Sequence, residues 1–262
     1  MRHDESVNVM KLLGVPEQNV IFLGYPDGGT NGMWQINWDY NNLHRGLNGI
    51  VKSPYPFSYE KSASYCGANV VNNLSEIFNT FNPTDIVYPD PNDEHHDHWA
   101  TNAFVKYVLT LQHRRVKEWT YLVHRSDFPW PWIYDSKLQL NPPKSLENIG
   151  VKWNYLPMSE KNKTTKYVAI KQYKSQLKIN QGFLEAFVRR MIDASADTIK
   201  TMYVKNSIHF TREPVLSINK TQLWLILPRL IDNSSAIFLS SDTVYDHMRI
   251  DKTAWRLVKV KY

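Results

Sequence analysis

The feature that most constrains the fold is a polar loop that joins an apolar run to a helical pattern. Residues 85–88 (Asp-Ile-Val-Tyr) have strand character, residues 90–98 are rich in imidazoles and carboxylates, and a helical pattern begins near Trp99. A strand that runs into a helix through such a loop is typical of an open α/β sheet, in which ligands bind at the carboxyl ends of the strands. The loop is therefore the first candidate for a functional site.

The segments on either side of this loop alternate between helix and strand patterns. Apolar residues recur at helical spacing in residues 2–13, 66–81 and 99–111, whereas residues 19–23 and 116–123 are short apolar runs that predict strands. Gly14 is placed to end the first helix. This alternation predicts an α/β fold with a mostly parallel sheet and helices on both faces.

The remaining segments have weaker patterns. Residues 30–65 are aromatic and irregular, which fits either a lid or pocket wall or a packed insertion, and residues 124–160 are rich in proline and aromatic residues. Residues 163–192 predict a helix that breaks near residues 180–182. Short β-like runs follow at 222–227, 236–239 and 254–260. We therefore expect a main domain over residues 1–200 and a small β-rich C-terminal extension over residues 201–262.

Composition excludes several classes of protein. The net charge is +6, but the basic residues are scattered rather than clustered, so a nucleic-acid groove is not expected. A single cysteine, Cys66, excludes an intramolecular disulfide framework and a Cys-x-x-Cys metal knuckle. No apolar run has the length of a membrane span, and there is no apolar core of a signal peptide. As written, the chain is expected to be cytoplasmic; the sequence does not define its oligomeric state.

The polar loop contains the residue types of a metal site, although this local pattern alone does not name a reaction. His95, Asp97 and His98 provide two imidazoles and a carboxylate within four residues. Neutral imidazole is a common zinc ligand, a neighbouring carboxylate can orient an imidazole, and Asp93 and His95 are placed to transfer protons. The alternative is a solvated helix N-terminus at which the acidic residues favour the helix dipole. That alternative accounts for the carboxylates but not for three histidines among four residues.

Several motifs together resemble those of one enzyme family, the PIG-L/LmbE-like zinc deacetylases. The order Asp-x-His-x-Asp-His after the strand Pro83-Thr84-Asp85-Ile86-Val87-Tyr88-Pro89 resembles the second signature of this family. Arg2-x-x-Glu5, Leu13-Gly14-Val15 and Phe22-Leu23-Gly24-Tyr25-Pro26-Asp27-Gly28 are similar to earlier family segments. Tyr121-Leu122-Val123-His124-Arg125, Pro142-Pro143 and Lys166-x-x-Ala169-Ile170-x-x-Tyr173-x-Ser175-Gln176 are similar to later ones. The resemblance extends in order over residues 2–190.

The resemblance implies a Rossmann-like fold and zinc-dependent hydrolysis of an N-acetyl group from an N-acetylglucosamine-type sugar or glycoconjugate. It implies that His98 is the zinc ligand, that His95 stabilises the oxyanion or donates a proton, and that Asp97 orients a histidine. Arg2 and Asp27 match substrate-contacting positions. The alternatives are an exposed terminus for Arg2 and ordinary turn chemistry for Asp27.

One family signature is missing from the sequence. His-Pro-Asp-Asp, which supplies two zinc ligands and the general base in the family, does not occur in these 262 residues. We therefore expect either an enzyme truncated at its N-terminus or a degenerate homologue that acts as a carbohydrate-binding module. If a preceding segment exists, it could carry a secretion signal or a membrane anchor, and the protein would then be secreted or anchored.

Overall fold

The computed structural model describes residues 1–189, except residues 48, 147–152, 155 and 157, and the backbone of four short strands beyond residue 206. The chain divides into two compact units. Unit 1 comprises residues 1–22 and 120–204, and unit 2 comprises residues 23–119 and 205–262. The predicted boundary at residue 200 lies outside the described residues, so the division into 1–200 and 201–262 remains a proposal.

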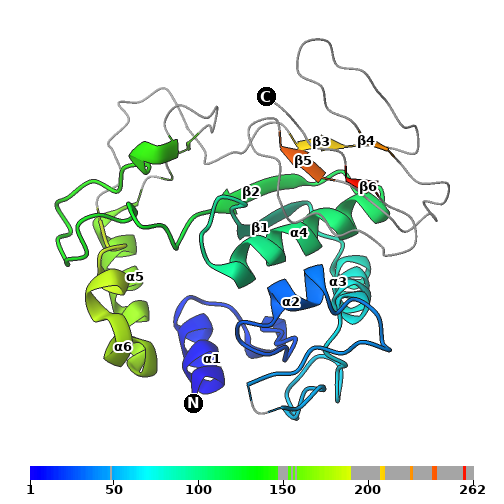
Figure 1. Ribbon diagram of the computed structural model, residues 1–262. Helices are drawn as coiled ribbons and strands as arrows, with labels where there is room; N and C mark the ends of the chain where they lie inside the picture. Colours follow the sequence, from blue (N-terminus) through cyan, green and yellow to red (C-terminus); the bar gives the residue numbers. More distant parts are fainter. Residues whose placement is uncertain are drawn as a thin grey trace. The chain divides into compact units, whose positions relative to one another are not determined.

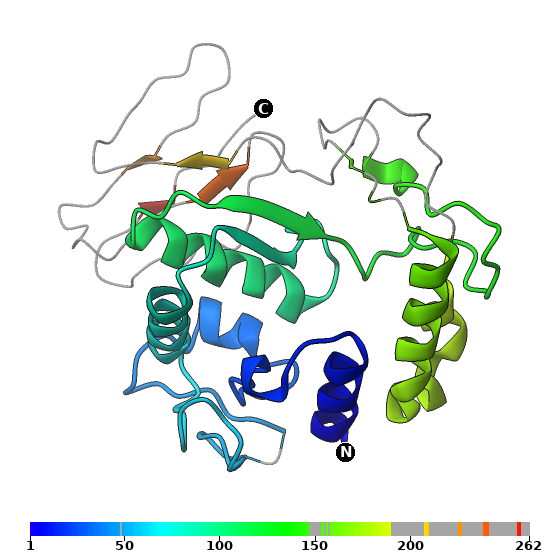
Figure 2. The ribbon, with the colours of Figure 1, turned by 180° about the vertical axis from the view of Figure 1, so that it is seen from behind.

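Unit 2 contains the strand–loop–helix segment predicted from the sequence (Figure 1). Its elements are α2 (Thr30–Gln35), α3 (Gly67–Phe81), β1 (Asp85–Pro89), α4 (His96–Leu111) and β2 (Lys117–Tyr121), the last of which continues into unit 1. Strands β1 and β2 form a parallel two-stranded sheet, and α4 packs against it, with α2 and α3 packed in turn on α4 (Figures 1 and 2). The predicted α/β class is thus confirmed.

The core of unit 2 explains the aromatic segment 30–65. Trp34 is 3% exposed and meets Phe104 and Tyr107 of α4 edge-on, while Trp38 stacks on Phe104 with the ring centroids 6.1 Å apart. These rings bury large apolar areas against α4. The segment is therefore a packed insertion at Trp34 and Trp38, and it holds the helix that begins at the polar loop.

Unit 1 is helical in its described part. Its elements are α1 (Arg2–Leu12), η1 (Glu17–Asn19), η2 (Lys144–Leu146), α5 (Glu160–Gln172) and α6 (Lys174–Glu185). Helix α1 ends as predicted at Gly14, which has φ +83°, with the bonds from Gly14 N to Lys11 O and from Val15 N to Met10 O that define a Schellman motif. The break predicted near residue 180 is a kink at Asn180 within α6, which follows a separate break at Tyr173.

One predicted strand does not form. Residues 19–23 contain the end of η1 and a single bridge residue, Phe22, and Ile21 is 47% exposed. Pro16 is extended and starts a 3-10 turn of polar residues, which uses backbone groups that a strand would need. An apolar run becomes a strand only where a partner strand accepts its hydrogen bonds, and periodicity alone does not reveal that partner.

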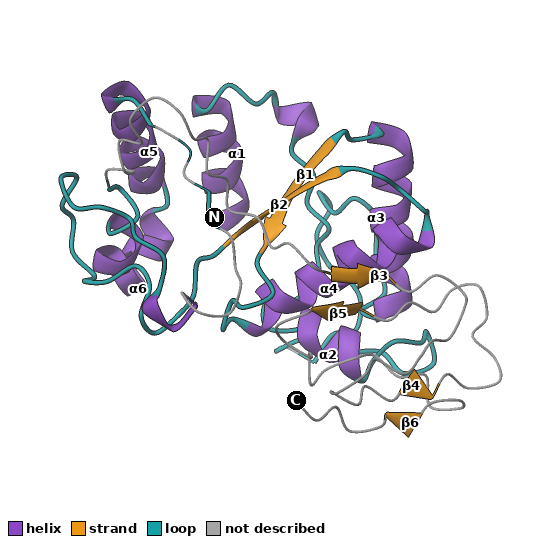
Figure 3. Ribbon diagram, turned by 90° about the horizontal axis from the view of Figure 1, so that it is seen from above, coloured by secondary structure: helices purple, strands orange, loops and turns teal. Residues whose placement is uncertain are grey.

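Two antiparallel strand pairs are described beyond residue 206. Strand β3 (Ser207–His209) pairs with β5 (Phe238–Ser240), and β4 (Leu225–Ile226) pairs with β6 (Arg256–Leu257) (Figure 3). Each of the three β-like runs predicted in this region contains or overlaps one of these strands.

Candidate active site

The polar loop is shaped by a buried carboxylate at the end of β1. Asp90 is 0% exposed and accepts hydrogen bonds from the backbone N–H and the side-chain Nδ2 of Asn92, at 2.8 and 2.9 Å. Asp93 N donates to Asp90 O at 3.1 Å, which closes the turn. From α4, Asn102 Nδ2 donates to Pro89 O at 2.8 Å. These bonds satisfy backbone groups at the strand end and fix where the loop leaves the sheet.

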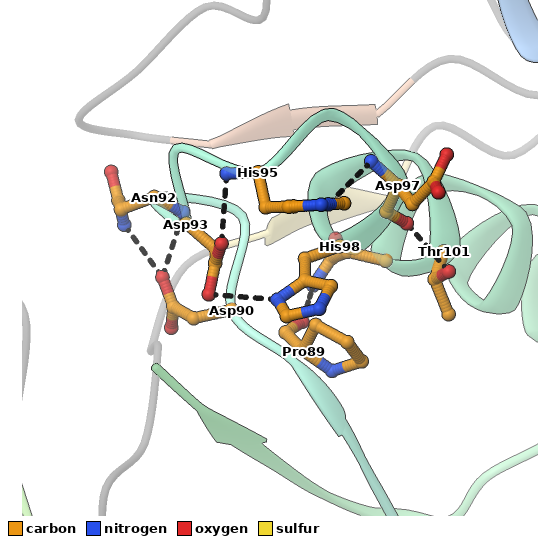
Figure 4. Close-up of polar contacts among 9 residues, drawn as sticks. Pro89, Asp90, Asn92, Asp93, His95, Asp97, His98 and Thr101 are labelled. Atoms are coloured by element: carbon orange, nitrogen blue, oxygen red, sulfur yellow. Dashed lines mark hydrogen bonds and ion pairs between the residues drawn. The ribbon is translucent and has the colours of Figure 1, made fainter. Parts of the chain in front are cut away.

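Asp93 orients His98. The Asp93 side chain is 0% exposed; one carboxylate oxygen accepts the His95 N–H at 2.9 Å, and the other lies 3.1 Å from His98 Nδ1 (Figure 4). This approach is an ion-pair contact, and a carboxylate oxygen beside Nδ1 favours the tautomer of His98 that carries its proton on that nitrogen. In the neutral ring Nε2 of His98 is then unprotonated and offers a lone pair, which is the form that ligates metals or accepts protons.

His95 is held in the opposite tautomer. It is the N-cap of α4, and its Nδ1 accepts the Asp97 backbone N–H at 3.2 Å (Figure 4). Because that backbone group can only donate, Nδ1 is unprotonated and the neutral ring carries its proton on Nε2. The rings of His95 and His98 lie 4.7 Å apart between centroids. The loop thus pairs one imidazole that donates through Nε2 with one that accepts through Nε2.

Asp97 contacts a different part of unit 2. Its carboxylate oxygens accept the backbone N–H groups of Gly28 at 2.6 Å and of Thr30 at 2.9 Å. These donors belong to the turn that contains Asp27 and to the start of α2. The hydrogen bonds of the Asp97 carboxylate are therefore with backbone donors at residues 28 and 30. The carboxylate that pairs with a histidine of the loop is that of Asp93.

The two candidate substrate residues lie in separate units. Asp27 is exposed in unit 2, and Arg2 is exposed on α1 in unit 1. With the amide oxygen of Gln176 turned toward it, the Arg2 guanidinium donates from Nε at 2.6 Å. Glu5, on the same helix, accepts from Ser175 N at 2.9 Å and from Ser175 Oγ at 2.5 Å. Two of the motifs quoted for the family resemblance, Arg2-x-x-Glu5 and Ser175-Gln176, thus contact each other.

His44 is a residue of the site region that the sequence did not reveal. It is partly buried beside the start of α2, where a Cβ added to Gly32 would lie 2.8 Å from its Nδ1. Burial lowers the pKa of His44, and the negative charge of Asp97 acts in the opposite direction. The only sequence signal was a lone histidine in an aromatic segment, which carries no spacing pattern.

The described residues do not fit a complete zinc centre. They contain no group of three or more His, Cys, Asp and Glu side chains that could hold a metal ion. A catalytic zinc site takes three protein ligands. His98 offers one suitable lone pair, so the described part of the chain presents at most one ligand through the polar loop.

A comparison with protein-family models matches residues 1–109 to PIG-L, described as GlcNAc-PI de-N-acetylase. The matched segment includes Arg2, Asp27 and the loop from Asp93 to His98, whereas the resemblance noted beyond residue 109 remains a likeness of motifs. Comparisons with curated proteins and with solved structures gave no match. Among the described residues, no helix is long and apolar enough to cross a membrane. The family predicted from the sequence, PIG-L, is thus the one that the chain matches over residues 1–109.

Proposed function

We propose that this protein is an N-deacetylase that acts on an N-acetylglucosamine-type sugar, and that His95 and His98 are its reacting pair. PIG-L membership suggests a deacetylase-type hydrolase. The observation that supports the finer proposal is the arrangement of the two imidazoles, because metal-assisted amide hydrolysis needs a donor for the developing oxyanion and an imidazole lone pair that can hold the metal.

His95 is proposed as the donor. Its Nε2–H would donate to the carbonyl oxygen of the acetyl group as water adds to the carbonyl carbon, and this hydrogen bond strengthens as negative charge develops on that oxygen. The water loses a proton as it adds, collapse of the tetrahedral intermediate breaks the C–N bond, and the amine leaves carrying that proton, so that the products are acetic acid (acetate at neutral pH) and the free amine. Within unit 2, Asp93 is proposed to assist this pair and Asp27 to contact the sugar; a substrate contact by Arg2 remains a prediction from the family resemblance.

His98 is proposed as the ligand that this loop contributes to a metal. The family is generally metal-dependent, and zinc is the expected ion. The described residues contain no set of three metal ligands, so the proposal names only His98 as a ligand. The roles proposed for His95 and Asp27 are stated without reference to the other ligands of the metal. In this proposal Asp93, with a carboxylate oxygen 3.1 Å from Nδ1, orients His98 so that its Nε2 can bind the metal.

The test is acetate release from N-acetylglucosamine substrates by the 262-residue protein, with and without added zinc. We expect His95→Ala to lower kcat by about 10²- to 10⁴-fold, the usual contribution of a positioned acid or base. We expect His98→Ala to abolish both activity and the uptake of about one zinc per chain, measured by equilibrium dialysis. The control is His96→Ala, which removes an exposed imidazole of the same loop. Full activity in His98→Ala would refute the assignment.

A second candidate function is a carbohydrate-binding homologue that does not hydrolyse its ligand. The absence of a three-ligand group among the described residues favours it. Segment 124–153 also exposes aromatic rings, with Trp130 69% exposed and Tyr134 48% exposed. In this case the protein binds N-acetylglucosamine, as followed by NMR titration, and releases no acetate. Tight stoichiometric zinc would argue against this candidate.

A further inference from the structure

Asp97 connects the polar loop to a segment that is distant in the sequence. Its two oxygens accept from Gly28 N and Thr30 N, residues that are 69 and 67 positions earlier in the chain. Gly29 N donates to Pro26 O at 3.1 Å, so residues 26–29 form a turn with Asp27 at its second position. Gly28, the third residue of this turn, has φ +74°, as a type II turn requires.

The chemistry of this contact explains why a carboxylate is present. Both partners are backbone N–H donors, so both side-chain oxygens must accept, and hydrogen bonds to an ionised carboxylate are stronger than those to a neutral acceptor. Asp97 is itself fixed, because it lies in the first turn of α4 and its carbonyl oxygen accepts from Thr101 Oγ1 at 2.7 Å. Asp97 thereby links the turn at residues 26–29 to the first turn of α4.

We infer that Asp97 is a positioning residue for Asp27, and that it joins the proposed sugar-contacting turn and the His95–His98 pair into one unit of structure. The proposed sugar contact and the proposed histidine pair lie next to this hydrogen bond in the sequence. Asp27 directly precedes Gly28, which donates the bond, and Asp97, which accepts it, lies between His95 and His98. This inference rests on the proposed function for Asp27 as a sugar contact. It assigns Asp97 to substrate recognition and leaves the orientation of His98 to Asp93.

The test uses Asp97→Asn, which preserves size but replaces one accepting oxygen with an amide that can only donate. We expect amide hydrogen exchange, followed by NMR, to become at least tenfold faster at Gly28 or Thr30. We also expect KM for the N-acetyl sugar to rise about tenfold while kcat changes less than threefold and the pH profile keeps its shape. If Asp97 instead orients a histidine, kcat and the pH profile change and both amides stay protected.

A double-mutant cycle separates action through Asp27 from a general loss of structure. Because Asp97 is inferred to act through Asp27, adding Asp97→Asn to Asp27→Ala should raise KM no further. Additive effects on KM would overturn the inference, as would unchanged exchange at both amides. If the wild-type protein releases no acetate, the cycle is run on the Kd for N-acetylglucosamine. A wild type that neither hydrolyses nor binds the sugar overturns both the proposed function and the role of Asp27, whereas exchange at Gly28 and Thr30 still reports the Asp97 contact separately.

Discussion

Replacement of Asp93 tests the electrostatic arrangement of the loop most directly. In Asp93→Asn, the amide oxygen can still accept the His95 N–H, but the NH₂ group then faces His98 Nδ1. Two donors cannot share a hydrogen bond, so His98 is expected to move its proton to Nε2. In ¹⁵N-histidine NMR spectra, the Nδ1 and Nε2 shifts of His98 should exchange their protonated and unprotonated values, and the protein should lose zinc uptake through that ring.

The cost in stability follows from the same contacts. A hydrogen bond to a charged group contributes about 1.5–3 kcal/mol, which is an upper limit for the Asp93–His98 ion pair because the His98 side chain is 27% exposed and water replaces part of the loss. We expect Asp93→Asn to lower the free energy of unfolding by about 1–2 kcal/mol. We expect Asp93→Ala to lower it by about 2–4 kcal/mol, because the His95 N–H then also loses its acceptor.

Urea unfolding at pH 7, followed by tryptophan fluorescence, measures these differences. The matched control is Asp39→Asn, which neutralises an exposed carboxylate of the same unit and should stay within about 0.5 kcal/mol of wild type. The reasoning is refuted if Asp93→Asn has the same free energy of unfolding as Asp39→Asn and the ¹⁵N shifts of His98 remain those of the wild type.

Two further predictions concern stability. Hydrogen bonds from the Ser175 side chain and backbone hold the pKa of Glu5 below its usual range. Their stabilisation is therefore present above about pH 4.3 and is lost as the pH falls through the lowered pKa, so Ser175→Ala should destabilise the protein at pH 7 more than at pH 2 in urea titrations; equal effects at both pH values would contradict this link. Gly24 has φ +79°, and an added Cβ would lie 2.5 Å from Ser53 Oγ, so Gly24→Ala should cost about 2–5 kcal/mol in the same assay. The control Gly49→Ala, with φ +78° and open space around the added Cβ, should cost only about 1–2 kcal/mol, and similar losses for the two would exclude the steric contribution.

The sequence predicted those elements whose pattern is local. Helices α3 and α4 follow from apolar spacing, and β1 follows from a short apolar run that ends in a polar loop. The loop also predicted a functional site, because a solvated helix N-terminus does not account for three histidines among four residues; the roles of these residues remain predictions. These features depend on neighbours within one or two helical turns, which periodicity can detect.

The sequence could not reveal contacts between distant segments. Nothing in residues 26–30 or 93–98 indicates that Asp97 accepts from Gly28, because hydrogen-bond partners 69 positions apart leave no spacing pattern. The same limitation led to the prediction of a strand at residues 19–23, where the structure has the end of η1 and a single bridge residue. It also concealed His44, whose surroundings are assembled only when α2 forms.

The aromatic packing against α4 has a practical consequence for all of these experiments. Trp34 and Trp38 lie edge to face, 5.8 Å apart between ring centroids, and both contact Phe104. Aromatic rings held in a fixed asymmetric arrangement give a near-ultraviolet circular dichroism signal. This signal therefore reports whether the rings remain packed against α4. A loop variant that keeps this spectrum but does not release acetate has lost a catalytic contribution of the loop. A variant that loses both the spectrum and acetate release has lost the packing of α4, the helix that carries the loop residues.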